Sequence, residues 1–278
     1  MATDNLVSQH YTHGELLSAI QAALSKQGNS IDKLTLADIA PVDEFHIGGR
    51  LATEHLLSQV NFSAEQDILD VGCGLGGAAR FIANHFNNRV CGIDLTAEYI
   101  ETGNVLSQWV GLDERVSLYQ GSALSMPFED SQFHGATQFH VGMNIKDKQT
   151  LFREIYRVLK PGSTFALYDI MRMESGALAY PVPWATEASY SHLSTLDEYQ
   201  AALIQAGFIV GDINERREFG LEFFSKMKER NQAQGGPPPL GLHTLMGAHT
   251  AVKVDNMLKN IRGGYIAPVE LMAYKSTD

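Results

Sequence analysis

A glycine-rich segment at residues 70–77, DVGCGLGG, constrains the fold of this chain more than any other feature of the sequence. It follows a short apolar run at 68–71 and precedes a run with helical spacing at 78–86. Glycines allow the backbone to turn tightly, and they leave main-chain N–H groups free to face a ligand. The segment therefore predicts a strand, a loop and a helix in succession, with a ligand bound against the loop.

The rest of the chain alternates between extended and helical patterns. Helical spacing at 96–110 and 147–159 predicts crossover helices between parallel strands. With the run at 68–71, strands are predicted at 89–93, 116–119, 133–138, 164–170, 208–213 and 268–274. This pattern predicts an α/β fold: a Rossmann-like, doubly wound, mostly parallel seven-stranded sheet.

Two helical regions are expected outside this core. Residues 1–62 show helical spacing without a strand signal and predict an N-terminal helical cap, in which a short turn at 35–41 ends at Pro41. Residues 63–278 then form the Rossmann-like domain. Within it, Gly and Pro punctuate residues 214–264, which predicts a C-terminal helical lid insertion there. The KPG triplet at 160–162 is expected to stop the preceding helix.

Charge and composition exclude several classes of partner. The chain has 21 basic and 32 acidic residues, a net charge of −11, so it should repel a nucleic-acid backbone. No apolar run approaches the ~20 residues of a membrane span, and the first residues lack a signal-peptide pattern. The two cysteines, Cys73 and Cys91, form no CxxC pair and HExxH is absent. We therefore expect a cytoplasmic protein without a metal site, and a homodimer is left open.

Two classes of ligand fit the glycine loop. Gly72, Gly74 and Gly77 satisfy GxGxxG, which is compatible with a nicotinamide-dependent oxidoreductase. Asp94, 22 residues after Gly72, can accept hydrogen bonds from ribose hydroxyls in either case. However, Asp70 places a carboxylate beside the loop, which disfavours a pyrophosphate and favours an ammonium or sulfonium group. S-adenosylmethionine carries both cations and no phosphate, and it is the preferred ligand.

Three further segments make a family resemblance specific. Together with DVGCGLGG, the segments GIDL (92–95), GSALSMPF (121–128) and RVLKPGS (157–163) resemble class I S-adenosylmethionine-dependent methyltransferases. The nearest resemblance is to sarcosine/dimethylglycine, coclaurine-type and ubiquinone-pathway small-molecule methyltransferases. It implies S-adenosyl-L-methionine as cofactor. The cofactor-binding residues that it implies are Asp70, Gly72, Cys73, Gly74, Asp94, Leu95, Ser122, Ala123 and Gln138. Ser122 stands where most members have Asp, and His134 where many do.

Residues for a small-molecule acceptor are expected from the cap, from the segment after the fourth strand, and from the segment after the fifth strand. The candidates are Asp43, Phe45, His46, His140, Asn144, Tyr180 and Trp184. No catalytic residue is assigned, although His140 and His46 are candidates for a base, and His140 fits equally a structural turn. A neutral amine can attack a sulfonium methyl without a base, so methyl transfer to an amine nitrogen is the first hypothesis.

Three alternatives stay open at this point. C- or O-methylation of a quinone, sterol or other lipid-like acceptor uses the same donor. The nicotinamide-dependent oxidoreductase rests on the glycine pattern alone. A donor-binding module without turnover would account for Ser122 and His134.

Overall fold

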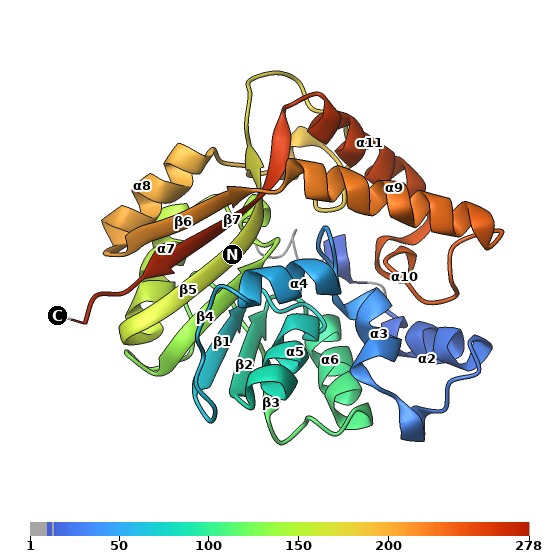
Figure 1. Cartoon of the computed structure of the whole chain (residues 1–278), viewed down its shortest axis with the longest axis horizontal. Coiled ribbons are helices and arrows are strands. Elements are labelled where there is room, and N and C mark those ends of the chain that lie inside the picture. The colour runs from blue at the N-terminus through green and yellow to red at the C-terminus, as the bar shows by residue number, and fades with distance from the viewer. Residues whose placement is uncertain (1–9, 13, 278) are drawn as a thin grey trace.

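A computed structural model describes residues 10–12 and 14–277, and Figure 1 shows a central sheet with helices on both sides. The strands are β1 (Asp67–Val71), β2 (Arg89–Asp94), β3 (Val116–Gln120), β4 (Phe133–Phe139), β5 (Leu159–Arg172), β6 (Ile209–Glu215) and β7 (Ile266–Tyr274). The α-helices are α2 (Leu16–Lys26), α3 (Leu36–Asp43), α4 (Arg50–Leu57), α5 (Gly77–Phe86), α6 (Ala97–Trp109), α7 (Lys148–Val158), α8 (Leu196–Ala206), α9 (Arg217–Ala233), α10 (His243–Met246) and α11 (Thr250–Arg262). Short 3-10 turns are η1 (Ile31–Lys33), η2 (Gly142–Asn144), η3 (Ala188–Tyr190) and η4 (Gly247–His249).

The sheet has seven strands in the order β3-β2-β1-β4-β5-β7-β6. Strands β1 to β5 pair in parallel, and β7 runs antiparallel to both of its neighbours, β5 and β6. The order changes direction between β1 and β4, so two helical layers cover opposite faces. The predicted doubly wound, mostly parallel seven-stranded sheet is confirmed.

Alternate residues of β1 show how the two helical layers are built. Ile68 belongs to a buried cluster with Ile82 of α5, and Leu69 belongs to another buried cluster with Phe152 of α7. Successive side chains of a strand point to opposite faces, so a continuous apolar strand must be covered on both sides. The short apolar run that predicted this strand is therefore the centre of both cores.

One of two local predictions about prolines was wrong. Helix α3 continues through Pro41 to Asp43, because the proline ring accepts a helical φ and sacrifices a single N–H hydrogen bond. The other prediction is confirmed, since the helix before the KPG triplet stops there: α7 ends at Val158, and β5 begins at Leu159 and includes the triplet. Pairing between β4 and β5 shifts register between Phe133 and Gly135, and this irregularity accommodates the triplet within the strand.

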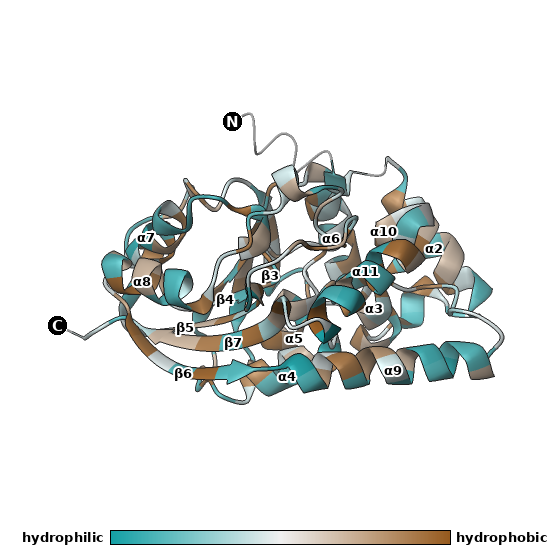
Figure 2. Cartoon of the chain, turned by 90° about the horizontal axis from the view of Figure 1, so that it is seen from above, coloured by the Kyte–Doolittle hydropathy of each residue, from teal (hydrophilic) through white to brown (hydrophobic). Residues whose placement is uncertain are grey.

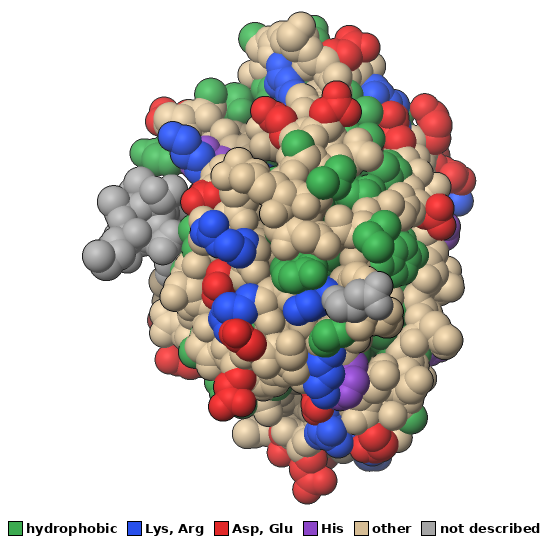
Figure 3. Space-filling model, turned by 90° about the vertical axis from the view of Figure 1, so that its left-hand side faces the viewer, with side chains coloured by type: hydrophobic (Ala, Val, Ile, Leu, Met, Phe, Trp, Pro, Cys, Tyr) green, Lys and Arg blue, Asp and Glu red, His purple; other side chains and the backbone are tan. Residues whose placement is uncertain are grey.

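The helices from both ends of the described chain gather at one end of the sheet. Helices α2, α3 and α10 lie together there in two perpendicular views, away from the C-terminus, and α11 packs beside α9 (Figures 1 and 2). Helices α9, α10 and α11 form the segment between β6 and β7 where the lid insertion was expected. Among the described residues, no helix combines the length and apolarity needed to cross a bilayer. On the face shown in Figure 3, acidic and basic side chains are interspersed.

Candidate functional site

A large cavity lies where four adjacent parallel strands end. Its volume is about 610 Å³. Its lining includes the first residue after each of the strands β1, β2, β3 and β4. Those residues are Gly72, Leu95, Gly121 and His140. In an open α/β sheet, ligands bind at the carboxyl ends of the strands where the strand order reverses. The cavity occupies that position.

Backbone conformation fixes the glycine loop at the cavity floor. Gly72, Gly74 and Gly76 have φ angles of +68°, +53° and +82°, a region in which other residues are strained. A Cβ atom at Gly72 would lie 2.3 Å from the Val141 side chain. The loop therefore needs glycine both for its turn and for its close approach to the segment after β4.

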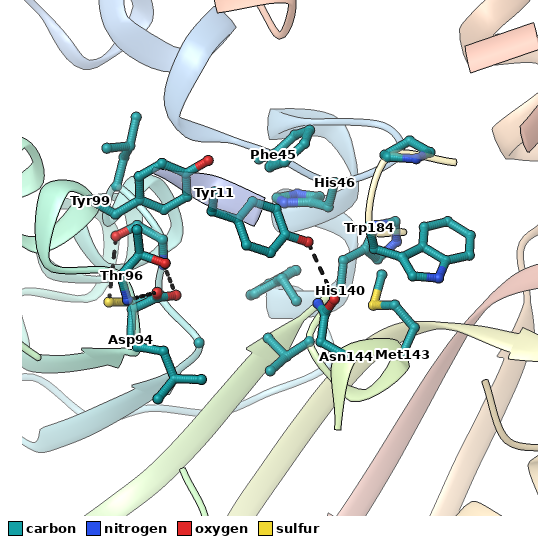
Figure 4. A pocket seen from close by; sticks show the side chains of 18 of the residues that line it. Tyr11, Phe45, His46, Asp94, Thr96, Tyr99, His140, Met143, Asn144 and Trp184 are labelled. Carbon is teal, nitrogen blue, oxygen red and sulfur yellow. Dashed lines mark hydrogen bonds between the residues drawn. The ribbon is translucent and has the colours of Figure 1, made fainter. Parts of the chain in front are cut away.

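Asp94 is held by the loop and by the start of the next helix. Its Oδ2 accepts a hydrogen bond from the Gly74 N–H at 3.1 Å, and its Oδ1 accepts one from the Thr96 N–H at 2.9 Å. Burial raises the pKa of Asp94, and these backbone donors oppose the rise. Figure 4 shows its side chain on one side of the cavity, next to Thr96 and Tyr99. We call this half of the cavity the Asp94 side.

Asp70, at the end of β1, offers a carboxylate oxygen that the described residues do not use. Its Oδ1 accepts a hydrogen bond from the Thr137 hydroxyl at 2.9 Å, while its Oδ2 is buried without a partner among the described residues. Burial raises the pKa of Asp70 to about 7. A buried acceptor with no donor is suited to a ligand that brings a cation or a donor of its own. The residues of the Asp94 side thus fit the ammonium and sulfonium of S-adenosylmethionine.

Positive charge is scarce around the cavity. Lys146 is the one lysine or arginine among the described lining residues, and it is exposed at the rim. Arg80 is fully buried and donates to the Asp43 carboxylate at 2.6 Å, so that cation is neutralised within the protein. A pyrophosphate would therefore meet two carboxylates, Asp70 and Asp94, and no buried cation. This lining disfavours a dinucleotide.

The opposite half, which we call the Trp184 side, consists of His46, His140, Met143, Trp184, Phe224 and Met257. Met143, Trp184, Phe224 and Met257 pack in one buried apolar cluster with Ile47. Figure 4 shows Tyr11 between the two sides, with its hydroxyl pointing toward Asn144. That hydroxyl donates to Asn144 Oδ1 at 3.4 Å.

The two histidines of the Trp184 side differ in their hydrogen bonding. His46 Nε2 lies 3.1 Å from the Gly49 carbonyl oxygen and 3.0 Å from the Thr53 hydroxyl. The His140 side chain has no hydrogen bond within the described part of the chain, and its Nε2 is buried. Burial lowers the pKa of His46 to about 4 and that of His140 well below its usual value. Both imidazoles are therefore neutral at pH 7.

Comparison with known families agrees with this geometry. A family model described as a methyltransferase domain matches residues 69–167, which span the glycine loop, Asp94 and β4. Over these residues the chain resembles the class I S-adenosylmethionine-dependent methyltransferases.

Individual relatives match parts of this chain. It is 35% identical over 125 residues to 24-methylenesterol C-methyltransferase 2 of Arabidopsis thaliana. That match covers 45% of this chain and 35% of the relative. It is 27% identical over 184 residues to Methyltransferase GfsG of Streptomyces halstedii, or 65% of this chain and 66% of that protein. The chain thus spans about a third of the length of the Arabidopsis protein and about two thirds of the length of the Streptomyces protein.

Among solved structures, a putative sarcosine dimethylglycine methyltransferase from Galdieria sulphuraria shares the fold. Its TM-score is 0.65 at 19% sequence identity, and the match covers 83% of this chain and 86% of that one.

The structure places most of the residues expected from sequence in one cavity. Those that line it are Asp43, Phe45, His46, Asp70, Gly72, Cys73, Gly74, Asp94, Leu95, Ser122, Ala123, His140, Asn144 and Trp184. Gln138 and Tyr180 are not among the lining residues. The Gln138 amide is buried and donates to Asp169 Oδ2 at 2.8 Å, and Tyr180 packs against the outer part of the Trp184 cluster. His134 lies at the opposite end of β4, where it accepts a hydrogen bond from the Asp67 N–H.

Several residues that line the cavity were not singled out from the sequence. Tyr11, Tyr99, Phe224 and Met257 all reach the cavity from helical regions. A helical lid insertion was expected at 214–264, but that expectation does not say which apolar face of a helix would meet the cavity. Tyr11 lies in the predicted N-terminal cap, and no motif in the sequence distinguishes it.

A hydrogen-bond network around Asp169 holds the 3-10 turn η2, and Gly142 is its tightest point. Asp169 Oδ2 accepts hydrogen bonds from the Tyr199 hydroxyl and the Gly142 N–H, both at 2.9 Å. A Cβ at Gly142 would lie 2.1 Å from the Tyr199 hydroxyl oxygen. We expect Gly142→Ala to destabilise the protein by about 1–3 kcal/mol, measured by urea unfolding. Gly220→Ala is the control, because its nearest neighbours would lie at 3.3 Å, and an equal loss there would contradict the prediction.

Proposed function

We propose that this protein transfers a methyl group from S-adenosylmethionine to a small-molecule acceptor. The observation that carries the proposal is the pairing of two unlike halves in one cavity: the acidic Asp94 side with its glycine loop, and the apolar Trp184 side. A bimolecular transfer needs both reactants next to one another in a space from which water is excluded.

The residues of the Asp94 side have separate tasks in holding the donor. Asp94, fixed by two backbone N–H groups, accepts hydrogen bonds from the ribose hydroxyls. Leu95, Ser122 and Ala123 border the adenine, and Asp70 faces the cationic methionine portion. Bound S-adenosylmethionine supplies an electrophilic methyl group on a positively charged sulfur. Tyr11, which lies between the two sides, covers the passage from donor to acceptor (Figure 4).

The donor-binding module without turnover receives less support than an enzyme. Ser122 and His134 were the two departures from the family pattern that suggested such a module. His134 lies at the far end of β4 from the cavity, so it does not bear on turnover. A module that only binds the donor has no need of a second, apolar half. The scarcity of cations at the cavity disfavours the nicotinamide-dependent oxidoreductase.

The lining of the Trp184 side bears on the acceptor atom. An amine nitrogen was the first hypothesis from sequence, but none of the six side chains on this side is a carboxylate that would hold an ammonium group. C- or O-methylation of a lipid-like, uncharged acceptor fits this lining better. Proteins named for both kinds of acceptor, a sterol and sarcosine/dimethylglycine, are among those similar to this chain.

The net charge of −11 supports a small molecule rather than a nucleic acid as the acceptor. Cys73 and Cys91 are both free thiols, which supports the expected cytoplasmic location. A homodimer stays a prediction.

Calorimetric titration with S-adenosylmethionine and with S-adenosylhomocysteine tests the donor assignment. We expect saturable binding of both, and we expect transfer of a labelled methyl group to one component of a pool of cell metabolites. Absence of binding at high micromolar concentration would defeat the proposal, and binding without any transfer would favour the inert module.

Donor binding should weaken as the pH falls below about 7. The donor's cation attracts the ionised form of Asp70, whose pKa burial raises to about 7, with the neighbouring Glu44 and Asp94 carboxylates adding to the rise. Protonation of Asp70 below that pH removes the attraction, so the dissociation constant should rise by at most about tenfold per pH unit. Calorimetry between pH 5.5 and 8 measures this, and Asp70→Asn should flatten the profile. An equally steep profile in Asp70→Asn would assign the titration to another group.

A further inference from the structure

The Trp184 side restricts the chemistry of the acceptor through the side chains that it lacks. Met143, Trp184, Phe224 and Met257 present thioether, aromatic and indole surface, and they are part of a continuous buried cluster. The Trp184 indole N–H is already used, because it donates to the Ser191 hydroxyl at 2.9 Å. A ligand in this half therefore meets an apolar wall with few hydrogen-bonding groups.

Charged groups near this wall are paired with one another. The Glu44 carboxylate lies behind His46, at 3.4 Å from its Nε2, and it accepts hydrogen bonds from the Arg50 guanidinium and the Thr53 hydroxyl, both at 2.6 Å. Glu44 and Arg50 are not among the lining residues. Lys146 and Asp147 line the cavity but are exposed at its rim. A charged acceptor group on the Trp184 side would lose its hydration without gaining a partner.

His140 is the polar group of this side that is left without a partner. Of the two neutral imidazoles, that of His46 is already hydrogen-bonded to the protein, whereas that of His140 is not. The His140 backbone has a φ of +54°, an unusual conformation for a residue with a side chain, and its N–H donates to the Tyr168 carbonyl at 2.7 Å. The ring packs against that of Tyr168, with centroids 5.0 Å apart, but its Nε2 has no hydrogen-bond partner among the described residues. A strained backbone that carries such a polar group is typical of a functional site.

We propose that the acceptor is an uncharged, largely apolar molecule with a hydroxyl group, and that this hydroxyl hydrogen-bonds to the imidazole of His140. This inference rests on the proposed methyl transfer and adds the class of acceptor to it. The hydroxyl proton passes to the imidazole while an oxygen lone pair forms the bond to the methyl carbon. The electron pair of the breaking sulfur–carbon bond stays on sulfur, which becomes a neutral thioether, and the imidazolium later releases its proton to solvent.

A matched set of naphthalene probes tests the inference with the protein saturated in S-adenosylhomocysteine. The set is 2-naphthol, 2-naphthylamine, 2-methoxynaphthalene, 2-naphthoate and 2-naphthylmethylammonium, titrated by calorimetry. We expect 2-naphthol to bind about tenfold more tightly than its methyl ether, which cannot donate, and more tightly than either charged probe. With S-adenosylmethionine instead, 2-naphthol should be converted to 2-methoxynaphthalene.

The variant His140→Asn isolates the imidazole, because asparagine tolerates a positive φ but is too short to replace the ring. It should remove the preference for 2-naphthol over the ether while leaving S-adenosylhomocysteine affinity unchanged. His134→Asn is the matched control, and it should keep that preference because His134 lies at the opposite end of β4 and does not line the cavity.

Several results would overturn the inference: tighter binding of the ammonium or carboxylate probe, methylation of the amine but not the hydroxyl, binding of none of the probes, or an unchanged preference in His140→Asn. The initial titration with S-adenosylhomocysteine separates the two levels. If S-adenosylhomocysteine does not bind, the proposed function itself is refuted. If it binds but the naphthalene probes do not behave as expected, only the proposed class of acceptor is refuted.

Discussion

Replacing Asp94 with alanine is expected to weaken S-adenosylmethionine binding by roughly 1.5–3 kcal/mol, or about 10- to 150-fold, the range for lost hydrogen bonds to a charged group. The side chain ends β2 and is fixed by the Gly74 and Thr96 N–H groups, so its position does not have to be organised when the donor binds. The substitution removes the acceptor for the ribose and also releases the glycine loop. Calorimetry with donor and demethylated product measures the loss.

Two further variants show whether the effect belongs to the site. Asp94→Asn retains one carbonyl oxygen for the backbone N–H groups, so its affinity should lie between those of wild type and Asp94→Ala. Asp67→Ala removes a carboxylate at the other end of β1, where Asp67 accepts from the Arg89 guanidinium at 2.8 Å, and should leave donor affinity unchanged. Donor affinity equal to wild type in Asp94→Ala would refute the ribose assignment.

The donor half of the cavity could be predicted from sequence because its parts are local. Each part is encoded by a short segment of sequence: a strand, a glycine loop, a helix, and an acidic residue at the end of the next strand. Parallel strands bring their carboxyl ends together, so these parts meet at one edge of the sheet. Gln138 shows the limit of this reasoning. It lies in β4, which is buried on both faces, so no alternation of polar and apolar residues reveals its direction. Its side chain turns to Asp169 of β5, a partner 31 residues away.

The acceptor half could not be predicted in the same detail, since it is assembled from distant segments. Tyr11 meets Asn144 across 133 residues, and Phe224 of α9 meets Met143 through a shared apolar cluster. Amphipathic spacing predicts that a helix has an apolar face, but only tertiary packing decides what that face covers. Arg80 is the extreme case, because an arginine on an amphipathic helix is usually a surface residue, yet here it is fully buried.

Arg80 joins the donor loop to two other parts of the fold, and its loss should have a large effect on stability. Its Nη2 donates to Asp43 Oδ2 at the end of α3 and to the Leu75 carbonyl of the glycine loop, both at 2.6 Å. Its Nη1 donates to the Gly103 carbonyl of α6 at 2.9 Å. Removing one member of a buried ion pair leaves an uncompensated charge, so Arg80→Ala should cost about 3–5 kcal/mol in urea unfolding.

The cost of losing Arg80 should depend on pH and on Asp43. Burial raises the pKa of Asp43 and Arg80 opposes that rise, so without Arg80 the pKa of the folded state moves further up. The folded state then binds more protons than the unfolded state above pH 4, so the free energy of unfolding falls as the pH rises. The loss in free energy of unfolding caused by Arg80→Met should therefore grow from pH 5 to pH 8. Adding Asp43→Asn removes the unpaired charge and should restore part of the stability and flatten this slope. A double variant as unstable as Arg80→Met alone at pH 8 would show that packing of the long side chain, rather than the ion pair, holds the loop against α3.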